Sequence, residues 1–535
     1  MQTVLLPAGW ERHMAPAATL LDGLGPSWVF WVAAVLLLFT GCLLLLSRPR
    51  LSVSLAVVGG LALGIASNGL VDDAYIQFRY ATNLADGHGA VFNPGERVEG
   101  VSGGSWVAAL ALARTVTGAD TARAGRLLSL VFAAAAILAA ASCGRMLAGA
   151  RGAATAALLW ASLPTPALYA ATGLETAAFT LALWGMGGAV AGKRPRTAGA
   201  FAALAATLRP EGIVLLIGAL PFWRRLGRAG RALLASGLAA SALIAGARYL
   251  YYGLPVPRSA VVKGITAAAG IPAGLAYLAQ VALEWWPLLL ILPWIAYNTR
   301  RLLPVLVPAL LWAVLVTLRG GDWMPGGRYL LPLAILLIGS AAAAAGDSAA
   351  TASPSFAHRV ARSAVFISIA WGLLLLAPLE RPSALPLGRS WRAMAEHRVQ
   401  SRWWEALGAW LKSVAPPGVR LASGPIGAVP YASRLPTFDM YGLCSKVTHT
   451  RDGDAGHRLW GLSEAVDAGS DAVYPGQGVP QGEDWDAVLE AARLQIRDVP
   501  DFETRFRPLG IDHSAEYHLD ILRDVIWIEP GAVRP

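Results

Sequence analysis

Charged residues are scarce in this chain. Only 15% of its 535 residues are charged, 55% are hydrophobic, and the mean hydropathy is +0.50. A soluble protein of ordinary composition carries about 25% charged residues. The shortage is confined to residues 1–380, because residues 381–535 are rich in Arg, Asp, Glu, Pro and Gly. The composition therefore excludes a single soluble domain and predicts a polytopic membrane region followed by a soluble domain.

Cysteine is also rare, and histidine shows no pattern. The three cysteines are Cys42 and Cys143 in apolar stretches and Cys444 alone in the soluble part, so no disulfide framework is predicted. The eight histidines lack metal-ligand spacing, and no Ser/His/Asp or Cys/His constellation is present. The sequence thus predicts no definite cofactor and leaves a role for a divalent cation open. Residues 1–27 lack the features of a cleaved signal peptide, so we expect the first apolar stretch to remain as an anchor.

Apolar stretches that could each cross a bilayer dominate residues 1–380. A spanning helix needs about 20 mostly apolar residues. The candidates are Trp28–Leu46, Leu51–Leu70, Arg126–Leu147, Ala153–Ala171, Thr176–Val190, Ala232–Tyr252, Gly274–Tyr297, Leu302–Leu318, Tyr329–Ala345 and Val360–Pro378.

The basic residues lie in short clusters between these stretches. This is the pattern of cytoplasmic loops, and it accounts for the net charge of +10 without nucleic acid as a partner. It predicts a multi-pass membrane protein with the N-terminus, the loop 71–122 and the soluble domain on the outer side. The clusters are Arg48-Pro49-Arg50, Lys193-Arg194-Pro195-Arg196, Arg224-Arg225 and Arg300-Arg301.

One apolar segment is interrupted. Phe201–Leu208 and Gly212–Phe222 are each too short to span, and Arg209-Pro210-Glu211 joins them. Basic residues stand at both outer ends of the pair, so both ends are expected in the cytoplasm. This predicts a re-entrant hairpin with Arg209 at its tip, where an arginine suits an anionic ligand. The alternative is one Pro-kinked helix in which Arg209 pairs with a nearby acid.

These patterns divide the chain into three parts. Residues 1–50 form an extra N-terminal anchor, residues 51–380 a catalytic membrane domain of about ten spans plus the hairpin, and residues 381–535 a soluble α/β domain. A Gly424/Gly427 turn in the soluble domain is not a full dinucleotide-binding motif. The elements expected there are an amphipathic helix over Ser401–Val414, strands near Val419–Ala422 and Leu435–Tyr441, and further elements at Asp486–Leu489 and Tyr517–Ile528.

Two adjacent carboxylates, Asp72 and Asp73, follow directly on the apolar stretch Leu51–Leu70. Charge beside a membrane helix is costly unless it faces water, a partner or a substrate. A carboxylate in a partly dry cleft can act as a general base toward a hydroxyl. The alternative is that the pair begins an amphipathic helix and caps it, and both roles are compatible because there are two carboxylates.

Other polar residues fall on the same predicted side of the membrane. Cationic side chains there suit the phosphate of a lipid-linked donor, although each could instead pair with a carboxylate. Trp323 offers a stacking face for a sugar in the Gly-rich loop 319–328, and Glu175 could accept sugar hydroxyls or cap a helix. We predict a donor phosphate or sugar site from Arg79, Glu175, Arg209, Arg258, Lys263, Asp322, Trp323 and Arg328.

Several motifs follow one another along the chain. They are Asp72-Asp73-Ala74-Tyr75-Ile76-Gln77-Phe78-Arg79-Tyr80, Val91-Phe92-Asn93-Pro94-Gly95-Glu96-Arg97-Val98-Glu99-Gly100, Gly173-Leu174-Glu175-Thr176, Leu208-Arg209-Pro210-Glu211-Gly212, Gly320-Gly321-Asp322-Trp323-Met324, Gly427-Ala428-Val429-Pro430-Tyr431 and Asp439-Met440-Tyr441-Gly442-Leu443. Together these motifs resemble a family of membrane glycosyltransferases. The 72–100 segment resembles the first outer loop of GT-C enzymes, in particular the terminal β-(1→2) arabinofuranosyltransferases of the actinobacterial cell wall.

The resemblance implies a GT-C fold and an inverting transfer of a sugar, arabinofuranose, from a polyprenyl-phosphate donor. It also implies a bacterial inner membrane, with the site and the soluble domain facing the periplasm. The acceptor would be a glycan, glycolipid or protein on that outer face, and membrane lipid would be a further partner. Asp72 matches the family's catalytic aspartate, with Asp73 the second choice. The stretch Val101–Trp106 departs from the family pattern. The same pattern of membrane spans is compatible with two other functions: a transporter or flippase of lipid-linked sugars, and a non-catalytic glycan-binding assembly partner.

Overall fold

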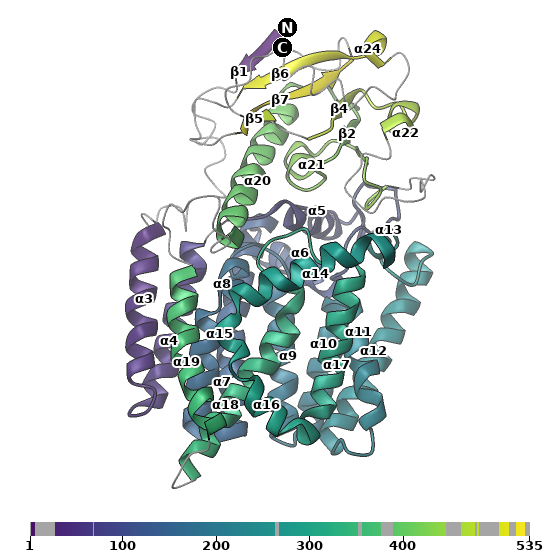
Figure 1. Ribbon diagram of the computed structural model, residues 1–535. Helices are drawn as coiled ribbons and strands as arrows, with labels where there is room; N and C mark the ends of the chain where they lie inside the picture. The colour runs from purple at the N-terminus through teal and green to yellow at the C-terminus, as the bar shows by residue number, and fades with distance from the viewer. Residues whose placement is uncertain are drawn as a thin grey trace.

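The chain folds into a bundle of apolar helices with a smaller domain above one end (Figure 1). We refer to that smaller part, built from α20, α21 and a β-sheet, as the sheet domain. The computed structural model describes residues 2–5, 27–67, 69–262, 267–350, 356–375, 389–445, 462–476, 479–480, 502–512 and 521–529.

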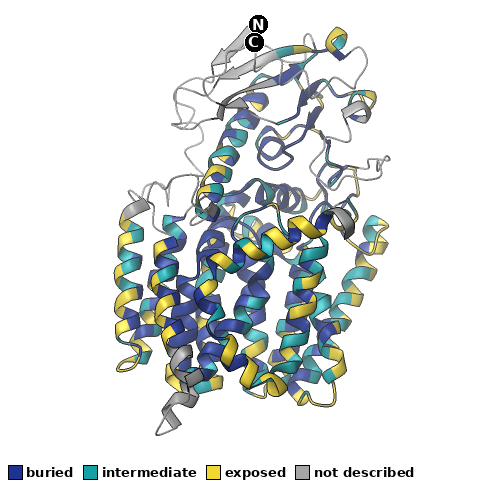
Figure 2. Ribbon diagram, viewed as in Figure 1, coloured by how far each residue is buried: buried dark blue, intermediate teal, exposed yellow. Residues whose placement is uncertain are grey.

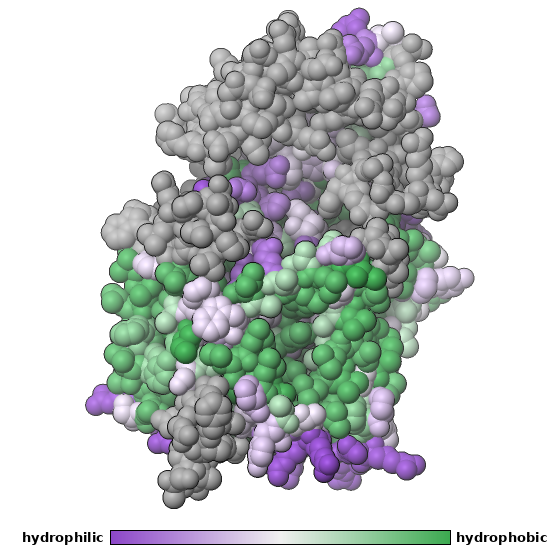
Figure 3. Space-filling view, in the orientation of Figure 1, coloured by the Kyte–Doolittle hydropathy of each residue, from purple (hydrophilic) through white to green (hydrophobic). Residues whose placement is uncertain are grey.

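Most of the predicted apolar stretches fall on helices of the bundle. By length and composition, five helices of the described residues could cross a membrane, or six if one bent pair counts as a single span. Figure 3 shows a broad apolar belt across the visible face of the bundle, with hydrophilic side chains at its lower end and between the belt and the sheet domain. Within the described residues, α3 and α9 and the apolar part of α19 are shorter than the other spans. The principal helices are α3 (Ser27–Leu43), α4 (Pro49–Ala66), α7 (Thr121–Ser162), α9 (Thr176–Ala191), α12 (Arg228–Tyr252), α17 (Thr299–Leu318), α18 (Leu331–Ala350) and α19 (Phe356–Leu375).

Helix α7 is two antiparallel arms rather than one long helix. Ala148 and Gly149 have non-helical backbone angles, and Gly149 is in the left-handed region at φ 64°. A Cβ on Gly144 would lie 2.2 Å from the carbonyl oxygen of Gly152, so the chain turns back on itself here. In a straight helix these residues would stand about 12 Å apart. The two spans predicted on either side of residue 150 are therefore confirmed, and α8 (Pro164–Tyr169) extends the second.

The interrupted segment is a hairpin of two short helices, α10 (Pro195–Leu208) and α11 (Ile213–Ala219). The one-turn 3-10 helices η2 (Pro210–Gly212) and η3 (Leu220–Phe222) flank α11. Its tip reaches the 71–122 segment, where the Thr207 hydroxyl donates to that of Ser105 at 2.9 Å. Gly218 packs against Pro308, halfway along α17, so the chain is already returning. The α10 arm measures about 21 Å at 1.5 Å per residue, too short to cross about 30 Å of hydrocarbon.

The stretch Gly274–Tyr297, predicted as one span, is broken. Gly270–Glu284 and Trp286–Tyr297 meet at an angle of 85°. Prolines explain the break, because Pro287 and Pro293 lie in the first turns of α15 and α16 and lack the N–H that would continue a helix. The elements are α14 (Ala267–Glu284), α15 (Trp286–Leu289) and α16 (Leu292–Tyr297).

The 71–122 segment covers the end of the bundle nearest the sheet domain. It contains two helices, α5 (Asp72–Ala85) and α6 (Gly104–Thr117), where the sequence suggested a polar loop. Most of α5 is buried, from Ala74 to Asn83 (Figure 2). Both aspartates lie in its first turn, so the pair begins the helix as the alternative proposed, but the N-cap residue is Val71 and not an aspartate. The short helix α13 (Arg258–Val262) and the 3-10 turn η4 (Arg328–Leu330) lie at the same end of the bundle.

The sheet domain is α/β, as predicted. Its long helix α20 (Arg389–Val414) begins well before the expected Ser401. Strand order is β1-β6-β7-β4-β2-β3, with β5 also paired to β7. The N-terminal strand β1 pairs in parallel with β6, so both ends of the chain contribute to one sheet. The predicted element Asp486–Leu489 lies outside the described residues. The elements are α21 (Ala428–Ser433), α22 (Leu462–Asp467), α24 (Phe502–Arg505), β1 (Gln2–Leu5), β2 (Leu421–Ser423), β3 (Thr437–Asp439), β4 (Ala472–Tyr474), β5 (Val479–Pro480), β6 (Arg507–Asp512) and β7 (Ile521–Ile528).

Candidate functional site

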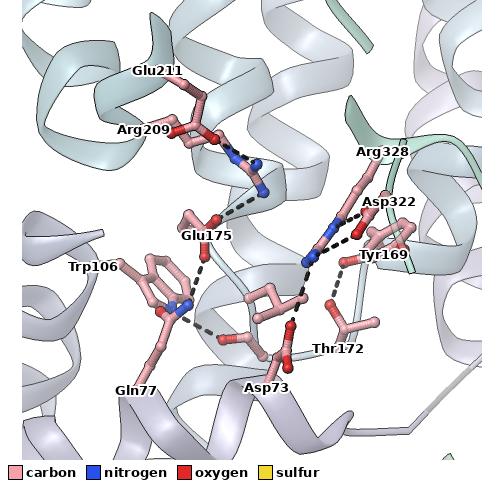
Figure 4. Close-up of polar contacts among 12 residues, drawn as sticks. Asp73, Gln77, Trp106, Tyr169, Thr172, Glu175, Arg209, Glu211, Asp322 and Arg328 are labelled. Atoms are coloured by element: carbon pink, nitrogen blue, oxygen red, sulfur yellow. Dashed lines mark hydrogen bonds and ion pairs between the residues drawn. The ribbon is translucent and has the colours of Figure 1, made fainter. Parts of the chain in front are cut away.

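Asp73 faces a group of charged side chains at the end of the bundle (Figure 4). Its Oδ2 lies 3.7 Å from Nη2 of Arg328, and its side chain is 26% exposed. The group comes from four separate segments, and we call it the charged cluster: Asp73, Glu175, Arg209, Asp322 and Arg328.

The loop 319–328 positions Arg328 and Asp322 against each other. Nε of Arg328 donates to Oδ2 of Asp322 at 2.5 Å and its Nη2 to Oδ1 at 3.2 Å. The glycines of this loop take up left-handed backbone angles, for example Gly321 at φ 86° and Gly327 at φ 74°. Side chains would also clash there, because a Cβ on Gly321 would lie 2.7 Å from Tyr277. The loop is therefore closely packed. Arg328 makes two hydrogen bonds to Asp322 but lies 3.7 Å from Asp73, so its interaction with Asp322 is the stronger of the two.

Arg209 at the hairpin tip forms the second half of the cluster. Its Nη2 lies 2.9 Å from Oε1 of Glu175, and its Nη1 lies 3.3 Å from Oε1 of Glu211. The amide of Gln77 donates to the other oxygen of Glu175 at 2.8 Å. Burial opposes the charge on Glu175, but Arg209, Gln77 and Arg328 outweigh it, so the pKa of Glu175 lies below its ordinary value. Glu175 is therefore an ionised anchor for the hairpin tip.

Aromatic rings hold the two guanidinium groups side by side. The Cζ atoms of Arg209 and of Arg328 each lie 5.2 Å from the centroid of Tyr329. Tyr169 lies beneath Arg328 at 5.8 Å. Cation–π contacts of this kind stabilise a cation by about 0.5–2 kcal/mol. The sequence pattern did not indicate a role for Tyr329, Tyr169 or Gln77. A local signal was present for Gln77, which follows Asp73 by one helical turn.

Asp72 turns away from the cluster and binds the sheet domain. Its Oδ1 accepts the N–H of Ala428 at 2.7 Å and its Oδ2 that of Gly427 at 3.2 Å, at the start of α21. Burial raises the pKa of Asp72 to about 7, the Asp73 charge acts in the same direction, and the two backbone N–H bonds act against it. The carboxylate preferred from the sequence as the base thus has a hydrogen bond on each oxygen.

Arg79 and Arg258 are engaged elsewhere. Four hydrogen bonds from Arg79 reach Phe92, Asn93, Pro430 and Leu435, which ties α5 to the sheet domain. Nε of Arg258 donates to the carbonyl of Gly442 at 2.8 Å. These contacts favour a structural role for both residues over the predicted donor site.

Trp323 and Lys263 complete the set of predicted site residues. Trp323 follows Asp322, is 39% exposed, and meets the ring of His397 edge-on with centroids 5.1 Å apart. Lys263 lies outside the described residues. Among the residues described, no three His, Cys, Asp or Glu side chains are placed to hold a metal ion.

The fold of this chain is similar to that of a membrane protein of known structure. The crystal structure of ArnT from Cupriavidus metallidurans in the apo state has a TM-score of 0.51 and 13% identity, covering 90% of this chain and 99% of that one. The structure of ArnT bound to undecaprenyl phosphate has the same coverage, a TM-score of 0.48 and 15% identity. The chain therefore has the predicted GT-C fold of a polytopic helical membrane protein.

Sequence comparison identifies no function. A family model described as "Domain of unknown function (DUF8728)" matches residues 390–496, within the sheet domain. No curated protein sequence matches the chain.

Proposed function

We propose that this protein is an inverting glycosyltransferase that moves a sugar from a polyprenyl-phosphate donor to an acceptor on the periplasmic face of a bacterial inner membrane. One observation carries the proposal: two buried guanidinium groups flank Tyr329 where the membrane helices meet the 71–122 segment, and the partly exposed Asp73 adjoins one of them. We place the lipid-linked phosphate at this level because the apolar belt ends here, and a lipid phosphate lies at the surface of the hydrocarbon layer. The GT-C fold supports the same function.

The donor phosphate would bind at Arg328 by displacing Asp73. Arg328 is held by Asp322 at 2.5 Å but by Asp73 only at 3.7 Å, so Asp73 is the partner that an incoming phosphate replaces. Arg209 supplies the second positive charge. Displacement also releases the Asp73 carboxylate from Arg328 beside the donor sugar. Asp73 therefore becomes available as the base only when the donor binds.

The chemical step follows from these positions. Asp73 takes the proton of an acceptor hydroxyl, and the hydroxyl oxygen forms a bond to the anomeric carbon of the donor sugar. The bond between that carbon and the phosphate oxygen breaks, and its electron pair stays on the polyprenyl phosphate. Arg328 and Arg209 stabilise the resulting negative charge because they are preorganised and shielded from water. Attack from the face opposite the phosphate inverts the anomeric centre.

The contacts of the two aspartates favour Asp73 over Asp72 as the general base. The sequence resemblance selected Asp72, but Asp72 accepts hydrogen bonds from Gly427 and Ala428, whereas Asp73 lies in the charged cluster. We therefore assign the base to Asp73 and the orientation of the sheet domain to Asp72. The two assignments predict different mutant kinetics.

The transferred sugar that we propose is arabinofuranose, on the motif resemblance. The stretch Val101–Trp106, where the motifs depart from the family, borders the cluster. A Cβ on Gly103 would lie 3.3 Å from the carbonyl oxygen of Leu208 and 3.6 Å from the side chain of Glu175. Substitutions there would therefore change the space around Glu175, which makes this stretch a determinant of sugar choice.

The test is transfer by purified protein. Synthetic polyprenyl-phosphate arabinofuranose and an arabinofuranosyl oligosaccharide should yield an elongated product, detected by mass spectrometry. We expect Asp73→Asn to lower the rate about 10²–10⁴-fold, the contribution of a general base, and Asp72→Asn to retain more activity. Asp86→Asn, on the exposed face of the same segment, is the matched control.

The other outcomes separate the rival functions. Full activity in Asp73→Asn with loss in Asp72→Asn would return the base to Asp72. Movement of the donor across vesicles without transfer would identify a flippase instead. Oligosaccharide binding without either activity would identify an assembly partner.

A further inference from the structure

His397 of the sheet domain lies against the glycine-rich loop 319–328. Its imidazole meets Trp323 edge-on at 87°, and Trp323 adjoins Asp322 in the glycine loop. His397 is partly buried, which lowers its pKa, while the charges of Asp73 and Asp322 act against that shift. The ring contact with Trp323, together with the influence of both carboxylates, places His397 near the charged cluster, although it belongs to a different domain.

The helix that carries His397 is firmly held. The next residue, Arg398, is buried, and its Nη2 donates to the carbonyl of Leu168 in α8 at 3.0 Å. A Cβ on Gly69, at the entrance to α5, would lie 2.5 Å from the Arg398 side chain, so the two segments are in direct contact. At its first turn, α20 is also bonded through Ser390 to Glu284. His397 is thus placed by the bundle itself.

Trp323 is equally fixed but leaves part of its ring uncovered. Close contacts around Gly321 and Gly327 fix the loop on both sides of it, while its side chain is 39% exposed. An exposed indole beside a hydrogen-bonding imidazole is an arrangement suited to a sugar, which stacks one apolar face and bonds through its hydroxyls. A neutral imidazole can donate from one nitrogen and accept at the other.

We propose that His397 and Trp323 form the acceptor-binding subsite, in which a sugar ring of the acceptor stacks on Trp323 and His397 bonds one of its hydroxyls beside Asp73. The proposal rests on the proposed function. We assign the acceptor to this subsite because His397 lies on α20 of the sheet domain, whereas Arg209 and Arg328, which would hold the donor phosphate, lie at the hairpin tip and at the end of the loop 319–328. It also gives a role to a domain for which the matching family model names none.

The kinetic test separates the acceptor from the donor. With synthetic polyprenyl-phosphate arabinofuranose and the arabinofuranosyl oligosaccharide, His397→Ala should raise the acceptor KM about tenfold, the effect of one lost hydrogen bond. Its donor KM and its slow hydrolysis of donor without acceptor should stay unchanged. His397→Gln should recover most of the affinity because its amide can donate and accept. Trp323→Phe should keep stacking that Trp323→Ala loses. Glu396→Gln, an exposed neighbour on α20, is the control.

A binding measurement makes the outcome independent of turnover. Calorimetric titration of the same oligosaccharide, without donor, should show binding to the wild type that His397→Ala and Trp323→Ala weaken. If the wild type binds the oligosaccharide in this way but transfers nothing, the proposed function fails and the subsite stands. A rise in donor KM in place of acceptor KM would overturn the proposal, as would equal binding by all variants or no binding to the wild type.

Discussion

Two faces of one helix, α5, serve different parts of the molecule. Asp73 and Gln77, one turn apart, face the charged cluster, where their contacts are Arg328 and Glu175. Asp72, Tyr75 and Arg79 face the sheet domain, where their contacts are backbone N–H groups, Glu405 and backbone carbonyls. The first face is ionic and partly exposed at Asp73, whereas the polar side chains of the second face are hydrogen-bonded to the sheet domain. Adjacent aspartates thus have separate roles because a helix turns about 100° per residue.

The largest difference between the two faces should appear when one arginine in contact with each face is replaced by lysine and transfer rate and stability are compared. Arg328→Lys keeps a positive charge but loses the paired bonds to Asp322 and the planar contact with Tyr329. We expect transfer to fall about 10²–10³-fold, as for loss of one preorganised donor at a developing charge, with a small change in melting temperature. Initial rates at saturating donor and thermal unfolding in detergent would measure both. A rate within a few-fold of the wild type would remove Arg328 from the site.

Arg79→Lys is the matched change on the other face. One ammonium cannot replace four hydrogen bonds to Phe92, Asn93, Pro430 and Leu435, so buried acceptors lose their donors. Each buried group left unpaired costs about 1–3 kcal/mol, so we expect a stability loss of about 2–4 kcal/mol. Hydrogen exchange should rise in α5 and α21 before it rises in the membrane helices. Unchanged exchange there would show that Arg79 does not hold the domains together.

The sheet-domain face should also respond to pH. Burial raises the pKa of Asp72 and of Glu405 to about 7. A buried carboxyl with a raised pKa holds its proton to higher pH in the docked state than in the undocked one. Docking is therefore favoured at low pH and weakens as pH rises from about 4 to 7. Exchange of the 427–433 amides, corrected for intrinsic rates, should increase over that range.

A pair of variants checks the origin of this pH response. Asp72→Asn should flatten the dependence, and Glu405→Gln should remove a further part. Buried Asp439, whose pKa rises to about 6, contributes in the same direction from within the sheet domain. A wild-type response in both variants would assign the effect to Asp439 or to groups elsewhere.

Much of this arrangement could be predicted from the sequence. Most of the features that were not predicted depend on contacts between distant parts of the chain. Hydropathy and charge indicated the bundle and the hairpin at Arg209, because those signals are local. The partners of Asp72 lie 355 and 356 residues later in the chain, and no local pattern reports such a contact. The break near Trp286 was missed because hydropathy averages over Pro287. Tyr329 was missed because its role depends on two arginines brought together only by folding.

The smallest effect should come from Asp86, which belongs to neither face. It lies just past the end of α5 and pairs with Arg114 at 3.1 Å, and the carboxylate is 42% exposed. Exposed pairs contribute about 0–1 kcal/mol because water and salt screen them. Asp86→Asn should therefore leave transfer, exchange in α5 and melting temperature within error of the wild type. A measurable loss of transfer would mean that the end of α5 is coupled to Asp73, and the division of the helix into two independent faces would be wrong.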